Sequence, residues 1–167
     1  MTHLQQDARF KNLDCTKVKQ VFVLCGANDV DRVLGLPKQA QSEFLNASRL
    51  KIHEGVLGTA KSDFTQLADY LNSWAKTATV NFINILPRES CIRNTVINML
   101  NCHIKHMENQ KHFVRMVSTE LNRNLFSFKN GYRKSNYFSN NGHDNVHLNR
   151  SGVGRLARHL KYLAHNK

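Results

Sequence analysis

The sequence has few of the residues that mark disulfide-rich or disordered chains. Its 167 residues include two prolines and four cysteines, and no Cys-x-x-Cys pair occurs among Cys15, Cys25, Cys91 and Cys102. This scatter argues against a disulfide framework, so reduced, structural cysteines are expected. Internal repeats and low-complexity tracts are also missing. The length and the 41% hydrophobic content therefore predict one globular domain with a single core.

Long apolar segments are missing as well. The first seven residues contain no apolar segment of a signal peptide, and no apolar segment of the sequence is long enough to span a membrane. These two absences predict an intracellular chain, cytoplasmic or nuclear.

Acidic residues are scarce. The sequence holds 24 basic and 12 acidic residues, which gives a net charge of +12 and a pI of about 9.9. Such a charge favours polyanionic partners such as nucleic acid or an anionic membrane surface. A basic but otherwise unspecialised surface explains the same numbers, so charge alone does not decide between them.

Three apolar segments predict β-strands, over residues 21–25, 79–86 and 113–118. The first is apolar at every position, which is typical of a strand covered on both faces in a parallel sheet. A sheet with only these strands in chain order would leave that segment at an exposed edge, where another chain could pair with it. The sequence is therefore expected to begin in the middle of a fold that lacks its first strands.

Helical periodicity predicts three helices. One opens at Ser62 or Asp63, which can cap it, a second covers residues 89–110, and a third covers 151–164. Residues 29–62 fit a helix followed by a loop rich in glycine, and residues 122–142 fit a long loop. In the last helix five residues are expected to be buried, namely Val153, Leu156, Ala157, Leu160 and Leu163.

The alternation of strands and helices predicts an α/β fold built from βαβ units around a parallel sheet. Residues 1–20 form a polar N-terminal segment, and residues 21–164 form the domain.

Two loops carry the residues that point to chemistry. Asp144 precedes His147 by three residues, on a loop that enters the last helix, and this spacing suits a carboxylate that orients an imidazole. Gly26-Ala27-Asn28-Asp29 follows the first strand. Both loops are expected at the carboxyl ends of parallel strands, where open α/β sheets build their sites.

These residues resemble two sequence blocks of the SGNH (GDSL-type) hydrolases. Gly26-Ala27-Asn28-Asp29 is similar to the third block, and the segment from Asp144 to Asn149 is similar to the fifth block, Asp-x-x-His-hydrophobic-Asn. The segment 83–88 resembles the strand followed by proline that many members of this family have between these two blocks. The resemblance covers roughly residues 18 to 164.

The resemblance implies a flavodoxin-like three-layer sandwich and hydrolysis of a small acyl or acetyl ester by a Ser-His-Asp triad. His147 would be the general base, Asp144 its orienting acid and Asn28 a donor to the oxyanion, while Gly26 would let the turn close. No metal or cofactor is implied.

The nucleophile of this family lies in a Gly-Asp-Ser turn after the first strand, and residues 1–20 contain neither glycine nor serine. The chain is therefore expected to be either the C-terminal part of a longer hydrolase or a short protein that has lost catalysis, without esterase turnover of its own. Other serines lack a strand-to-helix turn that would aim a hydroxyl at His147; they include Ser42, Ser48, Ser62, Ser139 and Ser151.

Two alternatives stand beside the hydrolase. His143, Asp144 and His147 could bind zinc, although no further ligand stands at a recognisable spacing. A module that binds single-stranded RNA or DNA would use cations interleaved with aromatic residues. The cations are Arg133, Lys134, Arg150, Arg155, Arg158 and Lys161, and the aromatic residues are Phe126, Phe128, Tyr132, Tyr137 and Phe138.

The simpler interpretation is that these cations form a solvated helix face and that the aromatic side chains pack the loop onto the core. The family resemblance also includes domains from retrotransposon- and virus-derived polyproteins, which are similar in their basic, asparagine-rich character. A branch that lacks the triad binds RNA.

Overall fold

The computed structural model describes residues 13–36, 51–88, 90–117, 126, 135–139 and 147–165. Most of the N-terminal segment 1–20 and of the loop 122–142 lies outside these ranges. The described elements are, in chain order, the 3-10 helix η1 (Cys15–Lys17), β1 (Gln20–Val23), α3 (Ala27–Val33), α4 (Glu54–Trp74), β2 (Thr79–Ile83), α5 (Cys91–Gln110), β3 (Val114–Val117), the 3-10 helix η3 (Ser135–Tyr137) and α6 (Arg150–His165).

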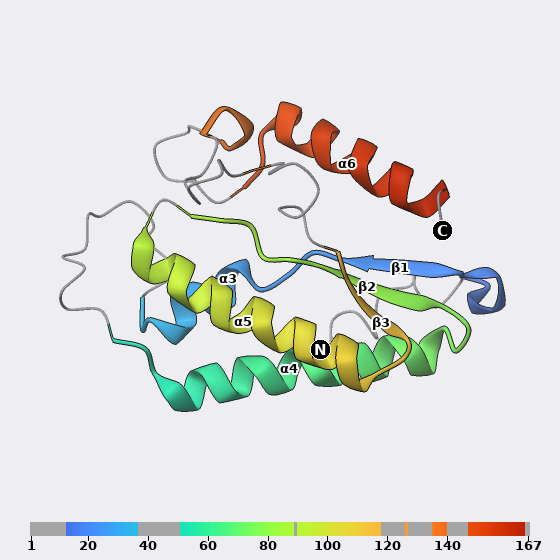
Figure 1. Cartoon of the computed structure of the whole chain (residues 1–167), viewed down its shortest axis with the longest axis horizontal. Helices are drawn as coiled ribbons and strands as arrows, with labels where there is room; N and C mark the ends of the chain where they lie inside the picture. Colours follow the sequence, from blue (N-terminus) through green and yellow to red (C-terminus); the bar gives the residue numbers. More distant parts are fainter. Residues whose placement is uncertain are drawn as a thin grey trace.

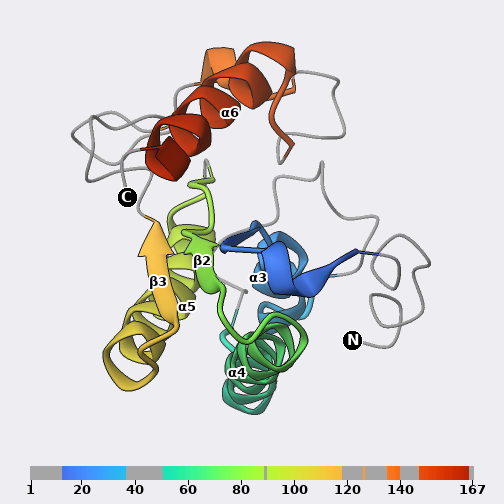
Figure 2. The same ribbon diagram turned by 90° about the vertical axis from the view of Figure 1, so that its right-hand side faces the viewer.

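The three strands form one parallel sheet in the order β1-β2-β3. Figures 1 and 2 show α3, α4 and α5 on one face of this sheet and α6 on the other. The chain is therefore an α/β protein with three layers, consistent with a flavodoxin-like sandwich, and the predicted fold class is confirmed. Within the described residues, no helix is both long and apolar enough to cross a membrane.

The central strand β2 is the most buried of the three. Val80 and Phe82 belong to the core cluster under α4 and α5, and Ile83 belongs to the second cluster, under α6. Side chains of a strand alternate between its two faces, so a strand between two covered faces must be apolar on both. The burial of β2 on both faces therefore fits its central place in the sheet.

The first strand contacts core residues on both faces, as predicted, but the cover is incomplete. All four residues of β1 are half-buried, and Leu24 just after it is 48% exposed. Val21 and Val23 pack against the α4 side, and Phe22 packs against the α6 side. β1 is an edge strand, as expected for three strands in chain order, because among the described residues only β2 pairs with it.

The predicted start of the first of the three helices is wrong, because α4 begins at Glu54 rather than at Ser62 or Asp63. Gly55 and Gly58, assigned to a loop, lie in its first turns. A glycine inside a helix costs about 1 kcal/mol relative to alanine. Burial of Leu57 in the core offsets this cost, since full burial of a leucine is worth about 1.5–3 kcal/mol.

The buried face of α6 differs from the predicted one. Val153 is 55% exposed and Ala157 is exposed, whereas Gly152 and Leu156 are buried. A Cβ atom on Gly152 would lie 2.2 Å from the Tyr137 carbonyl oxygen, so only glycine allows this approach. The contact turns Gly152 toward η3, and Val153 consequently turns toward solvent.

Other boundaries shift by a few residues. β2 ends at Ile83, and after the Asn84 amide, which still donates to the Val117 carbonyl at 3.1 Å, the chain leaves the sheet, so the predicted strand 79–86 is too long. α5 starts at Cys91 instead of residue 89.

The start of α4 can be tested with Gly58→Ala. A Cβ at this position meets no atom within 4 Å. The substitution should stabilise the protein by about 0.5–1 kcal/mol if the segment is helical, because alanine has the higher helix propensity. Urea unfolding of the two proteins measures the difference. Unchanged or lower stability would contradict a helix at this position.

Candidate active site

The turn after β1 requires a glycine. Gly26 has a φ of 96°, in the left-handed region, and is the N-cap of α3. A Cβ atom here would also lie 2.6 Å from Cδ1 of Ile85 and 2.8 Å from Cζ of Phe64. Both the backbone conformation and the close packing therefore exclude larger residues. Asn28 follows in the first turn of α3, with its side chain exposed.

A buried arginine ties this turn to the segment after β2. Arg88 is 7% exposed, and its Nη2 donates to the Ala27 carbonyl oxygen at 2.8 Å. The same guanidinium lies 3.7 Å from Oδ2 of Asp31, whose Oδ1 accepts from Nε of Arg93 at 2.8 Å. These charge-assisted contacts join α3, the segment after β2 and α5 at one end of the sheet.

Two asparagines of α5 hold the segment after β2. Asn94 accepts from the Arg88 amide and donates to the Arg88 carbonyl, both at 2.8 Å. Asn101 accepts from the Ile85 amide at 2.8 Å and donates to its carbonyl at 3.3 Å. The two residues are seven positions apart, which places them on one face of the helix. This spacing was the available signal for a role that the sequence analysis missed.

The segment before α6 pairs with the end of the long loop. Phe138 and Leu148 form an antiparallel bridge. The Ser139 amide donates to the His147 carbonyl at 2.9 Å, and the Asn149 amide donates to the Tyr137 carbonyl at 3.0 Å. The backbone at His147 is thereby fixed against residues 137–139.

Asn149 connects this pairing to the start of α6. Its Nδ2 donates to the carbonyls of Asn136 and Phe138 at 2.9 and 3.0 Å. Its Oδ1 accepts from the Gly152 amide at 2.9 Å, which is the geometry of a helix N-cap. An asparagine is suited to this position because it both donates and accepts. The last residue of the resembling fifth block thus has a structural role that its sequence position did not reveal.

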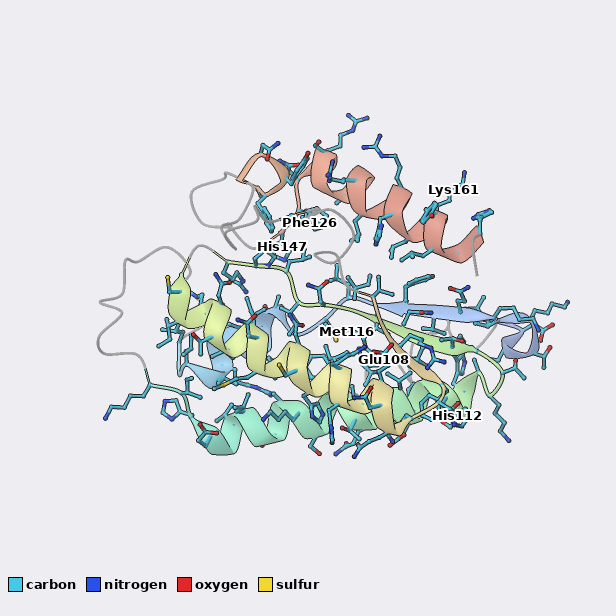
Figure 3. The ribbon with its side chains drawn as sticks, viewed as in Figure 1. Glu108, His112, Met116, Phe126, His147 and Lys161 are labelled. Carbon is cyan, nitrogen blue, oxygen red and sulfur yellow. The ribbon has the colours of Figure 1, made fainter. Side chains whose placement is uncertain are left out.

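The two predicted site segments lie over the same end of the sheet. In Figures 1 and 2, α3 and the segment that enters α6 lie at the end toward which the strands run. Figure 3 shows His147 on the sheet side of that segment, and its side chain is exposed. Asp144 and His143 lie outside the described residues, so the Asp144–His147 pair stays a prediction. Among the described residues, no group of three or more His, Cys, Asp or Glu could hold a metal ion.

Ser139 is the described serine nearest to His147 along this pairing. Since Phe138 pairs with Leu148, Ser139 lies directly across from His147, and both side chains project from the same face of the pairing. Ser62 lies inside α4 and Ser151 in the first turn of α6, and both are exposed. Ser42 and Ser48 lie outside the described residues.

Cys25, next to Gly26, does not supply a nucleophile in place of serine. Burial raises the pKa of its thiol to about 12, and the nearby Asp29 carboxylate adds to the rise. At neutral pH this cysteine is therefore a thiol, whereas attack on an ester requires the thiolate.

The described cations of the predicted basic cluster differ in their exposure to solvent. Arg150, Arg158 and Lys161 are exposed, but Arg155 is half-buried and lies 4.9 Å from the ring centre of Tyr137. Arg133 and Lys134 lie outside the described residues.

For two of the aromatic residues, the simpler interpretation of packing onto the core is confirmed and the stacking alternative is not. Phe126 and Phe138 are buried, and their ring centres lie 6.1 Å apart in an edge-to-face contact. Their faces are covered by the core under α6, so they cannot stack on bases. Phe128 and Tyr132 lie outside the described residues.

Comparison with known proteins supports the fold. No protein-family model matches the chain, and no curated protein sequence matches it. Among solved structures, it is similar to a candidate platelet activating factor from Streptococcus pneumonia, with a TM-score of 0.56 and 17% sequence identity. The match covers 87% of this chain and 59% of that one, so this chain spans less than two thirds of its length. At this identity the likeness shows a shared fold.

The role of Asn149 can be tested with two substitutions. Asn149→Asp keeps the acceptor for the Gly152 amide and loses both donated bonds, whereas Asn149→Ala loses all three. We expect Asn149→Asp to lower the free energy of unfolding by about 1–3 kcal/mol and Asn149→Ala to lower it further. Urea unfolding gives both values. Equal stability of all three proteins would show that the hydrogen bonds of the Asn149 side chain do not stabilise the fold.

Proposed function

We propose that this chain carries the general base and an oxyanion donor of an SGNH-type serine ester hydrolase. His147 is the base, Asp144 orients it, Asn28 donates to the oxyanion, and Gly26 allows the turn that presents Asn28. The substrate class is a small acyl or acetyl ester.

One observation carries the proposal. The two segments that resemble family blocks are separated by more than a hundred residues, yet both lie over the end toward which the parallel strands run. Open α/β sheets bind ligands at this end. The Arg88–Ala27 contact and the Asn149 cap fix the backbone of the two segments independently, which gives both side chains rigid supports.

The proposed chemistry needs an additional hydroxyl. The hydroxyl oxygen attacks the acyl carbon while the neutral imidazole of His147 takes its proton. The Asn28 amide donates to the oxyanion of the tetrahedral intermediate, which collapses as the imidazolium returns the proton to the leaving oxygen. The proposal takes this hydroxyl from a group outside the chain.

An added alcohol can replace that hydroxyl. With p-nitrophenyl acetate and trifluoroethanol, we expect formation of trifluoroethyl acetate and p-nitrophenol at a rate that increases with alcohol concentration. His147→Gln and Asn28→Ala should each lower this alcohol-dependent rate at least about tenfold, since a general base and an oxyanion donor each contribute about a hundredfold or more in complete sites. The rate is followed by absorbance and the product by gas chromatography.

Two controls separate the outcomes. His106→Gln removes another exposed histidine and should leave the rate unchanged. Equal rates for the original chain, His147→Gln and Asn28→Ala would refute the proposed site. Turnover without alcohol that disappears in Ser139→Ala would instead identify Ser139 as the nucleophile, and would refute the need for an external hydroxyl.

A second candidate function rests on the outer face of α6. At 100° per residue, Arg150, Arg158 and Lys161 fall within an arc of about 80°. The helix contains no acidic residue, and among the described residues none of these cations forms an ion pair. We propose that this face binds the phosphates of single-stranded RNA.

The RNA proposal is tested by salt dependence. Binding of a uridine oligonucleotide, measured by fluorescence anisotropy, should weaken steeply with salt. The double substitution Arg158→Gln and Lys161→Gln should reduce the slope of log K against log salt by about 1.4, since each phosphate contact to a single strand contributes about 0.7. Lys51→Gln with Lys76→Gln, two exposed lysines elsewhere, is the control. Equal slopes in both double variants would contradict the assignment to α6.

A further inference from the structure

The two edges of the sheet differ in their backbone groups. At β1, the Thr79 amide donates to the Lys19 carbonyl at 2.9 Å. Backbone groups of successive strand residues point alternately to the two sides. Lys19 and Val21 therefore face β2, and the N–H and C=O groups of Gln20 and Phe22 face outward.

The same alternation applies at β3. The Val80 amide donates to the Phe113 carbonyl at 2.8 Å, so Phe113 and Arg115 face β2 with their backbone groups. The backbone groups of Val114 and Met116 consequently face the outer edge.

Both outward amides of β3 have partners within the chain. The Val114 amide donates to the Lys111 carbonyl at 2.9 Å. The Met116 amide donates to the Glu108 carboxylate, one of the contacts that lower the pKa of Glu108. Figure 3 shows Glu108 and Met116 beside each other at this strand. The charged Arg115 is exposed in its middle. These are the features by which natural edges avoid strand pairing.

The outer edge of β1 has none of these features. Among the described residues, the Gln20 and Phe22 amides have no partner, and no strand covers them. The strand carries no charge and is apolar at three of its four positions, and Leu24 after it is 48% exposed. In Figure 2 this edge faces away from β2. The edge is thus open to main-chain hydrogen bonds.

The charged residues that flank β1 indicate which kind of peptide segment could pair with its outer edge. The acidic residues before and after the strand already have partners, because Asp14 pairs with Lys17 at 3.1 Å and Asp29 pairs with Arg32 at 3.0 Å. Lys19 is exposed and forms no ion pair with the described residues. The chain as a whole carries a net charge of +12, which disfavours a second copy at this edge.

We propose that the outer edge of β1 binds an extended segment of a partner protein, which joins the sheet as a fourth strand. The segment has apolar residues at alternate positions and acidic residues at its ends. Its carbonyls accept from the Gln20 and Phe22 amides, and its acidic residues lie near Lys19. This is β-strand addition, in which main-chain bonds give affinity and side chains give specificity. It does not depend on the hydrolase or RNA proposals.

The probe is a synthetic peptide of alternating valine and threonine with two glutamates at each end, added to the full chain. Amide hydrogen exchange by NMR should show new protection at Gln20 and Phe22. Val21 and Val23, already bonded to β2, and the amides of β3 should change little. The same peptide with lysines in place of the glutamates should bind at least about tenfold more weakly, because like charges repel.

Gln20→Pro and Gln20→Ala form a matched pair. Proline removes the outward amide without breaking the β1–β2 hydrogen bonds, and it is tolerated at the first residue of an edge strand. Gln20→Pro should weaken peptide binding about tenfold, and Gln20→Ala should have little effect. If Gln20→Pro does not fold, Lys19→Glu should reverse the preference between the two peptides.

Four results would overturn the proposal. They are binding without protection of Gln20 and Phe22, absence of binding, equal affinity for the two peptides, and protection of both amides before peptide is added. In the last case, sedimentation distinguishes a second copy at the edge, seen as a dimer, from an edge already paired within a monomer.

Discussion

Parallel pairing of β2 with both neighbours determines where the other described elements lie. The strand is buried on both faces, so α4 and α5 must cover one side and α6 the other. Its register with β1 and β3 brings the ends of all three strands together. The candidate site lies at this end because the loops that leave parallel strands meet there.

Side-chain amides stabilise the connections at this end. Asn94 and Asn101 bind the backbone after β2, and Asn149 binds the backbone before α6. Each asparagine satisfies both donors and acceptors, which irregular segments cannot satisfy through regular pairing. The site is consequently built on fixed backbone, although Asn28 and His147 themselves are exposed. Exposure of the two side chains suits groups that must reach a substrate.

Much of the element order could be predicted from local patterns. The apolar runs located all three strands to within a few residues, and the motif after β1 correctly indicated a glycine turn. The errors have a common cause. Gly58 lies in a helix because neighbouring residues are buried, and Val153 is exposed because Gly152 contacts the Tyr137 carbonyl. Neither cause is present in the local sequence, since both depend on residues that become neighbours only after folding.

The sequence by itself determined the α/β class and the parallel sheet. It also placed one motif directly after the first strand and the other directly before the last helix. Periodicity and turn chemistry are local properties, so the sequence alone is enough for these features. Only the tertiary structure decided that the strands lie in chain order, that Phe126 and Phe138 belong to the core, and that the backbone of Ser139 pairs with that of His147. Strand order, and the pairing of each backbone donor, depend on contacts between distant parts of the chain. Composition and spacing do not specify these contacts.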